Sequence, residues 1–316
     1  MIALILNTNP VLRRALPDLT AISAQLGDTG RVFESPSLEA LPHVAQAIAD
    51  AAPDYLAIWG GDGTIHATLS AVTTAYAGRP LPTLCLLPAG TINTAARCIG
   101  MKGKAGRCLT RLVAAVRDGV EMTTHRRTTI RMGEQVGFLF GVGLIPNLLR
   151  GYNEAEKGGK WQSLKLFLSA TKTVGVGGYD RFFDPFHARI TVNGRVWHEG
   201  TWTNVSGGGI KCLPYGLNAY IRAAEVEGKF HFIAHALNSR RTFTQLVRLQ
   251  SGKGMKGVED DVLDEVIIET ETPQEYNFDG DNFPARTRFH LHAGPVVELV
   301  VPPKPKSNSP LGRARP

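Results

Sequence analysis

Two glycine-rich stretches contain the residue types best suited to bind phosphate. The first, GGDGT at 60–64, directly follows an apolar run at 55–59 and precedes a helix-like segment. Glycines let the backbone turn tightly, and the first turn of a helix presents unpaired N–H groups to an anion. An acidic side chain here would repel phosphate, so we expect Asp62 to bind Mg²⁺, to accept a proton or to cap a helix. This stretch therefore predicts a polyphosphate site.

The second stretch, PAGTIN at 88–93, repeats this arrangement after the apolar run 83–87. Two glycine turns at the carboxyl edge of a parallel sheet are typical of a nucleotide site. Thr91 could cap its helix or bind phosphate, and Asn93 could contact a base or ribose. The sequence has no G-x-x-x-x-G-K-[ST] motif and lacks the motif set of protein kinases, so we expect neither a P-loop enzyme nor a protein kinase.

A third stretch, DGDN at 279–282, places two carboxylates around one glycine near the C-terminus. One carboxylate could accept the proton of a substrate hydroxyl while the other orients it or binds a metal, as phosphoryl transfer to an alcohol requires. Asp-Gly is also a common hairpin turn, so this stretch alone indicates either a reactive pair or a simple turn. His290 and His292 would share one face of a strand, but two histidines are too few ligands to predict a metal site.

The elements that must position these residues change character along the chain. Short apolar runs at 2–6, 55–59 and 83–87 alternate with helix-like segments, which predicts βαβ units around a parallel sheet. Helices are expected to begin near Thr64 and to include residues 109–116.

From about Thr124 the apolar residues alternate, and residues 188–192 followed by Asn193-Gly194 predict a hairpin. Similar alternation recurs at 229–234, 265–269 and 286–292. The predicted fold class is therefore an α/β nucleotide-binding domain with a parallel sheet plus a C-terminal antiparallel β-sandwich domain.

The composition fits a globular protein of one large or two medium domains, because 43% of its 316 residues are hydrophobic and 20% are charged. Subtracting 28 Asp+Glu from 35 Lys+Arg gives a formal charge of +7, which favours phosphates, nucleic acid or a membrane surface as partners. No zinc-finger or RNP-type motif accompanies this charge, so we expect no nucleic-acid partner.

The sequence predicts a cytoplasmic protein that contacts the inner face of the membrane only peripherally. The N-terminal apolar run ends at Asn7 and has no basic segment before it, unlike a secretory signal. The apolar stretch 136–149 is shorter than the ~18 residues that a membrane span needs.

Residues 240–256 combine basic and apolar side chains. They could form a basic amphipathic helix on an anionic bilayer, or a helix that packs Phe243, Leu246 and Val247 on the β domain. The tail 304–316 is rich in proline and basic residues and is predicted to be disordered.

Taken together, the stretches 60–64, 88–93 and 279–281, with Ala96-Arg97, resemble the diacylglycerol kinase catalytic family. That family also contains sphingosine kinases, ceramide kinases and bacterial soluble lipid kinases. The resemblance extends over nearly the whole chain through glycine-marked stretches at 141–143, 158–167 and 207–209. It implies ATP-dependent phosphorylation of a lipid hydroxyl. It also implies an α/β domain, a β-sandwich, a cleft between them, and a final strand that returns to the first domain.

The resemblance implies two domains. The ATP-binding domain is predicted to comprise residues 1–124 and a returning segment of about 293–303, and the lipid-substrate domain residues 125–292. The resemblance implies Asp281 as the proton acceptor, with Asp279 as its partner and Asp62 as the main alternative. The residues implied in ATP binding are Asn7, Ser35, Gly60, Gly61, Asp62, Gly63, Thr64, His66, Gly90, Thr91 and Asn93.

Three places depart from the family pattern. The first loop reads Asn-Thr-Asn-Pro at 7–10 where relatives usually have Asn-Pro-x-Ser-Gly, and Asp281 replaces a glutamate that is one methylene longer. The sequence Glu-Gly-Lys at 227–229 replaces an Asp-Gly-Leu that holds a structural Mg²⁺ in some relatives, so we do not assign that structural metal to this chain.

The sequence therefore predicts a lipid kinase that uses ATP and Mg²⁺, acts on a membrane lipid such as diacylglycerol or ceramide, binds an anionic membrane surface, and is compatible with a homodimer. Two alternatives stay open. A soluble kinase of the NAD kinase type shares the Gly-Gly-Asp-Gly motif and a β-rich second domain, and a non-catalytic lipid-binding homologue would fit the altered first loop.

Overall fold

The structure is a computed structural model that describes residues 1–8, 18–156 and 182–304. It divides into two compact units, one formed by Met1–Arg126 with the segment that begins at Val297, the other by Arg127–Val296. Strands β5 (Thr123–Met132) and β16 (Asp281–Val301) each run from one unit into the other. Several sequence-based expectations fall outside the described residues: Asn9 and Pro10 of the first loop, the stretch 158–167, and the tail from 305 onward.

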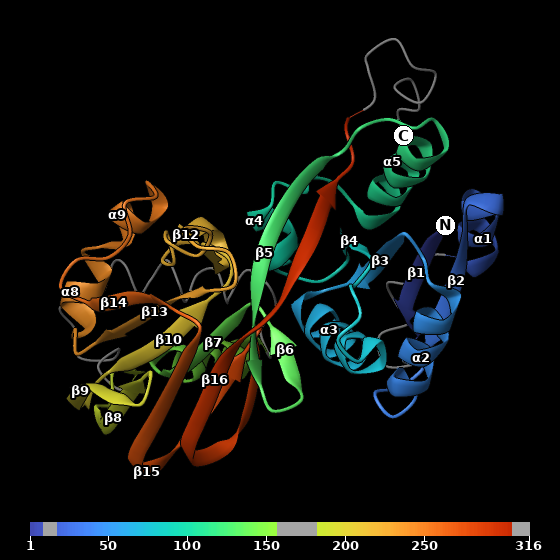
Figure 1. Ribbon diagram of the computed structural model, residues 1–316. Helices are drawn as coiled ribbons and strands as arrows, with labels where there is room; N and C mark the ends of the chain where they lie inside the picture. Colours follow the sequence, from blue (N-terminus) through green and yellow to red (C-terminus); the bar gives the residue numbers. More distant parts are fainter. Residues whose placement is uncertain (9–17, 157–181, 305–316) are drawn as a thin grey trace. The chain divides into compact units, whose positions relative to one another are not determined.

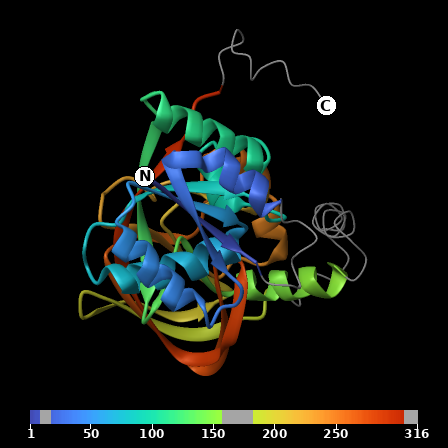
Figure 2. The ribbon, with the colours of Figure 1, turned by 90° about the vertical axis from the view of Figure 1, so that its right-hand side faces the viewer.

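The first unit is a parallel sheet with helices on both faces, as Figures 1 and 2 show. Its strand order is β16-β4-β3-β1-β2, and every pair is parallel. Residues 2–6 of β1, which lies between β3 and β2, are at most 1% exposed, as expected for a strand that is covered on both faces. The strands are β1 (Ile2–Asn7), β2 (Gly30–Ser35), β3 (Tyr55–Gly60) and β4 (Thr83–Pro88).

The helices of the first unit pack in pairs, α2 against α3 and α1 against α5. Their bounds are α1 (Leu19–Leu26), α2 (Leu41–Ala51), α3 (Asp62–Tyr76), α4 (Thr94–Cys98) and α5 (Ala105–Arg117). Helix α3 begins two residues earlier than the expected start at Thr64, because Gly61 is extended and its carbonyl already accepts the N–H of Ile65. Asp62 is therefore part of the first helical turn.

The second unit is antiparallel, with the order β14-β13-β10-β7-β15-β16; the β8–β9 hairpin joins β15, and β5–β6 joins β16 (Figure 1). The longer strands are β7 (Leu139–Gly143), β8 (Phe186–Val192), β9 (Arg195–Trp202), β10 (Asn204–Gly208), β13 (Phe230–His235), β14 (Glu259–Leu263) and β15 (Glu265–Phe278). The shorter elements are β6 (Gln135–Gly137), β11 (Cys212–Leu213), β12 (Leu217–Asn218) and α6 (Leu144–Glu156). Parallel strands in one unit and antiparallel strands in the other confirm the predicted fold class.

An aromatic core fixes the strands that bear the acidic turn. The ring of Phe140 on β7 lies 6.1 Å from that of Phe278 on β15 and 5.8 Å from that of Phe289 on β16, both edge to face. All three side chains are at most 1% exposed. Such aromatic pairs stabilise a core beyond the area they bury. The turn between β15 and β16 is therefore held by the packing of three strands.

Residues 240–256 form two short helices, α8 (Ser239–Phe243) and α9 (Leu246–Gln250), rather than the one helix that the sequence suggested. The side chain of Gln245 separates them because it bonds both the N–H and the carbonyl of Lys256, at 2.5 and 2.9 Å. Leu246 packs on a buried cluster, whereas Val247 is 76% exposed, so the expected packing of Val247 is wrong. Among the helices of the described residues, none is both long and apolar enough to span a bilayer.

Candidate active site

The predicted nucleotide-binding residues lie along one edge of the parallel sheet. Strand β1 ends at Asn7, which is in register with Ser35 at the end of β2. Strand β3 ends at Gly60, which is in register with Pro88 at the end of β4. Because the strands are parallel, these four residues share the carboxyl edge, where open α/β sheets bind ligands.

The two glycine turns touch through their backbones. A Cβ atom on Gly90 would lie 2.4 Å from the Cα of Gly61, and a Cβ on Gly61 would lie 3.0 Å from the Cα of Gly90. The N–H of Ala89 also donates to the carbonyl of Gly60 at 3.0 Å. The close approach therefore requires glycine at position 90, and it leaves only a tight fit for a side chain at position 61.

Asp62 connects the two turns. Its carboxylate accepts the N–H groups of Thr94 at 3.0 Å and of Ala95 at 3.2 Å, the first two residues of α4. Burial raises the pKa of Asp62, and these hydrogen bonds oppose that rise. Of the three roles predicted for Asp62, the geometry shows helix capping, of α4 rather than of its own helix. A role in binding Mg²⁺ or in accepting a proton stays a prediction.

The residues of the second turn differ in accessibility. Gly90 and Thr91 are exposed, whereas Asn93 is 5% exposed. The Asn93 amide donates to the Gly90 carbonyl at 2.8 Å and accepts the Gly90 N–H at 2.7 Å, with its own backbone in the left-handed region at φ 56°. Asn93 therefore holds the shape of the turn, and Thr91 with the glycine backbone presents its accessible face.

Ser35 and His66 are buried, at 6% and 7% exposure. The Ser35 hydroxyl donates to the carbonyl of Ser37 at 3.0 Å. Gly63 and Thr64 are half-buried in the first turn of α3. The most accessible groups of the predicted nucleotide set are thus the turn backbones and Thr91.

The acidic turn belongs to the second unit, and its two carboxylates have different environments. Asp279 is 6% exposed and its carboxylate accepts the N–H groups of Phe138 and Leu139, at 3.0 and 2.8 Å. Asp281, the first residue of β16, is exposed. Asp279 therefore anchors the turn, and Asp281 is the carboxylate that a ligand can reach.

Sequence reasoning missed Asn277 and Gly137, which shape the acidic turn. The Asn277 amide accepts the N–H of Gly280 at 3.1 Å and donates to the Asp281 carbonyl at 2.9 Å. A Cβ on Gly137 would clash with the Asp279 carboxylate. An asparagine two residues before Asp-Gly is a signal for such a turn, because its side chain bonds nearby backbone. The requirement at Gly137 depends on a residue far along the chain and leaves no local signal.

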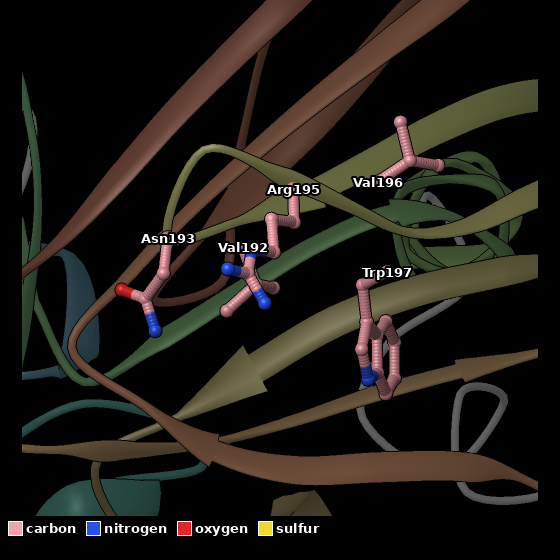
Figure 3. A pocket seen from close by; sticks show the side chains of 5 residues that line it. All are labelled: Val192, Asn193, Arg195, Val196 and Trp197. Atoms are coloured by element: carbon pink, nitrogen blue, oxygen red, sulfur yellow. The ribbon is translucent and has the colours of Figure 1, made fainter.

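Figure 3 shows a surface hollow of about 440 Å³ in the second unit, lined by Val192, Asn193, Arg195, Val196 and Trp197. All five residues come from the β8–β9 hairpin and its turn. None of them has a carboxylate or belongs to the predicted site, so we do not assign phosphoryl transfer to this hollow.

Comparison with known proteins gives matches in sequence and in fold. Residues 3–124 match the family described as the diacylglycerol kinase catalytic domain. No curated protein matches the chain in sequence. A diacylglycerol kinase structure from Bacillus anthracis str. Sterne has a TM-score of 0.64 at 17% identity, over 96% of this chain and 97% of that chain.

Two structures of provisionally named diacylglycerol kinases from the same organism, also 17% identical, have TM-scores of 0.65 and 0.67. The first covers 96% of this chain and 97% of its own, and the second 95% and 96%. At this identity, the likeness establishes a shared fold alone.

The sequence match covers strands β1 to β4 and both glycine turns of the first unit. It thus includes the residues that form the carboxyl edge of the parallel sheet. The resemblance that the motifs indicated is confirmed for residues 3–124, which match the model of the diacylglycerol kinase catalytic domain.

Proposed function

We propose that the protein is an ATP-dependent lipid kinase that transfers the γ-phosphoryl group to a hydroxyl of a membrane lipid, such as diacylglycerol or a sphingolipid. The observation that carries the proposal is the contact between the two glycine turns, where a Cβ on Gly90 would clash with the Cα of Gly61. These turns lie within the region that matches the diacylglycerol kinase catalytic domain.

The nucleotide phosphates would bind to the backbone N–H groups of the two turns and to the start of α3, because unpaired N–H groups at a helix N-terminus favour an anion. The exposed hydroxyl of Thr91 could donate a further hydrogen bond. Mg²⁺ neutralises phosphate charge when it is bound, and it prefers oxygen ligands. Because both oxygens of Asp62 accept backbone N–H groups, we expect phosphate and water oxygens to supply most of the metal's ligands.

Asp281 would act as the general base. Its carboxylate would accept the proton of the lipid hydroxyl while that oxygen attacks the γ-phosphorus and the bond to the β,γ-bridging oxygen breaks. Asp279 would be a positioning residue, because the N–H groups of Phe138 and Leu139 fix its carboxylate and the backbone that leads to Asp281. This division of roles follows from the burial of one carboxylate and the exposure of the other.

Replacing Asp281 by asparagine tests this assignment in an assay of ³²P transfer from ATP to detergent-dispersed lipids. Loss of a general base typically lowers turnover by roughly 10²–10⁴-fold, so we expect Asp281→Asn to lower kcat by that factor with little change in ATP affinity. Asp264→Asn is a matched control, since Asp264 is an exposed carboxylate of the same unit outside the turn. Unchanged kcat in Asp281→Asn, or a collapse of ATP affinity with normal residual turnover, would show that the assigned role is wrong.

We also propose that the α8–α9 region binds an anionic membrane surface peripherally. Val247 is 76% exposed, and the same segment exposes Arg240, Arg241, Lys253 and Lys256. An exposed apolar side chain in a segment with several exposed cations suits the headgroup region, where each Lys or Arg contributes about 1 kcal/mol.

The test of membrane binding is sedimentation with phosphatidylserine-containing vesicles. Burying a valine side chain in the bilayer contributes about 1.5–3 kcal/mol to the free energy of membrane binding. Val247→Glu should therefore weaken vesicle binding at least about tenfold. Val196→Glu serves as control, because Val196 is 55% exposed on β9. Equal loss in both variants, or no loss in Val247→Glu, would exclude this surface.

A further inference from the structure

Three side chains on one face of the second unit form a cluster that the proposed kinase reaction does not use: Glu265 at the start of β15, and His290 and His292 on β16. Glu265 is directly opposite His292 in the antiparallel register. His290 shares the face of His292, because side chains two residues apart on a strand point the same way. The strand register therefore supplies the third ligand that the two histidines lack in the sequence.

We propose that Glu265, His290 and His292 bind a divalent transition-metal ion of the Zn²⁺ class. One ligand atom from each residue lies within 4.8 Å of the others. The Nε2 atom of His290 is 2.6 Å and the Nδ1 atom of His292 is 3.9 Å from Oε1 of Glu265. Tetrahedral Zn²⁺ with bonds of ~2.1 Å holds its ligand atoms about 3.4 Å apart, so small side-chain rotations would complete the geometry.

The donor set selects the class of ion. Two imidazoles and one carboxylate suit Zn²⁺, Ni²⁺, Co²⁺ or Cu²⁺, whereas Mg²⁺ prefers oxygen ligands and an octahedral shell. This site therefore differs in kind from any Mg²⁺ that accompanies ATP. Three protein ligands also leave at least one coordination position for water or for another ligand.

The surroundings of the three side chains allow an ion to enter. Their side chains are 41–45% exposed, so solvent reaches them and they can adjust. The half-buried Ile267 lies opposite His290 on β15, so an apolar side chain adjoins the cluster on the same face of the sheet. The nearest cation along β16 on this face, Arg288, is 3.8 Å from the carboxylate of Glu269, which offsets its positive charge.

The cluster lies far from the acidic turn along the same pair of strands. Glu265 is the first residue and Phe278 the last of the 14-residue strand β15, a span of up to about 43 Å. A metal ion at the cluster would tie β15 to β16 and would not reach Asp281 along that strand. The inference therefore stands independently of the proposed kinase activity.

Zn²⁺ titration of the full chain without an affinity tag, against a chromophoric chelator, tests the proposal. We expect one site per chain that Mg²⁺ does not compete for. His290→Ala, His292→Ala and Glu265→Gln should each weaken it at least about tenfold, since loss of even an outer-shell partner costs 10–100-fold. His187→Ala is the matched control, because His187 pairs with Glu271 at 3.3 Å outside the cluster, and it should retain full affinity.

A spectroscopic measurement distinguishes ligation from a general effect on folding. The electron paramagnetic resonance spectrum of Cu²⁺ bound to the unchanged chain should show coupling to two imidazole nitrogens, and that of His292→Ala coupling to one. Glu265→Gln preserves a hydrogen-bond acceptor, so it supplies a folded variant should a histidine substitution fail to fold. Absence of binding at micromolar Zn²⁺, equal affinity in the three cluster variants and the unchanged chain, or equal loss in His187→Ala would overturn the proposal.

Discussion

At the scale of single residues, the carboxylates of the candidate site divide into two that hold backbone and one that faces solvent. Asp62 and Asp279 each accept two or more backbone N–H groups, whereas Asp281 is exposed. The sequence identifies all three as candidates by type and spacing. Type and spacing alone could not separate their roles, which only the family resemblance distinguished, because the N–H donors lie 32 residues from Asp62 and about 140 residues from Asp279.

His235 gives a pH prediction at the same scale. It is 3% exposed, its Nδ1 accepts the N–H of Leu237 at 3.3 Å, and burial lowers its pKa to about 4. In the unfolded chain this histidine binds a proton near pH 6.5, whereas burial keeps it neutral in the folded protein until about pH 4. Its contribution to the free energy of unfolding is therefore fully present above pH 6.5 and is lost as the pH falls to about 4. Burial lowers the pKa of His231 in the same direction.

The expected loss attributable to His235 between pH 6.5 and 4 is about 3 kcal/mol in the free energy of unfolding. Urea unfolding at a series of pH values measures it. His235→Gln should flatten the dependence on pH, whereas His43→Gln, at an exposed position of α2, should leave it unchanged. An equally steep slope in His235→Gln would show that other groups cause the acid sensitivity.

At the scale of elements, local patterns predicted the parts that depend on neighbouring residues. The apolar runs at 2–6, 55–59 and 83–87 became β1, β3 and β4, and Asn193-Gly194 forms the turn of the β8–β9 hairpin. The basic segment 240–256 was harder, because its break at Gln245 depends on hydrogen bonds to Lys256 that no periodicity reveals.

The contact of the two glycine turns makes a prediction about these elements. Gly90→Ala would place a Cβ 2.4 Å from the Cα of Gly61 and force the turns apart. We expect a loss of roughly 1–3 kcal/mol in the free energy of unfolding, as for other overpacked sites, together with weaker ATP binding. Denaturant unfolding and nucleotide titration measure the two effects.

Gly106→Ala in α5 is the matched substitution. A Cβ there would lie 3.6 Å from the Trp59 ring, an ordinary contact, so this change should be neutral or stabilising by up to about 1 kcal/mol. Similar effects of the two substitutions on both measurements would contradict the role assigned to the close approach.

At the scale of the whole molecule, the residues to which the proposal assigns roles are divided between two units. The glycine turns lie in the unit that contains residues 1–126, and the acidic turn lies in the unit of residues 127–296. The 21-residue strand β16 begins at Asp281 and ends in the first unit, beside Leu84 of β4. The alternation of apolar residues predicted the antiparallel class of the second unit, but strand order depends on long-range pairing that the pattern does not encode.

The most direct test of the central claim is transfer of ³²P from the γ-position of ATP to detergent-dispersed diacylglycerol, ceramide and sphingosine, with NAD as a soluble acceptor in parallel. The proposed function predicts label in at least one lipid and none in NAD. Label in NAD alone would indicate a soluble kinase, and ATP binding without label in any acceptor would contradict the lipid kinase account.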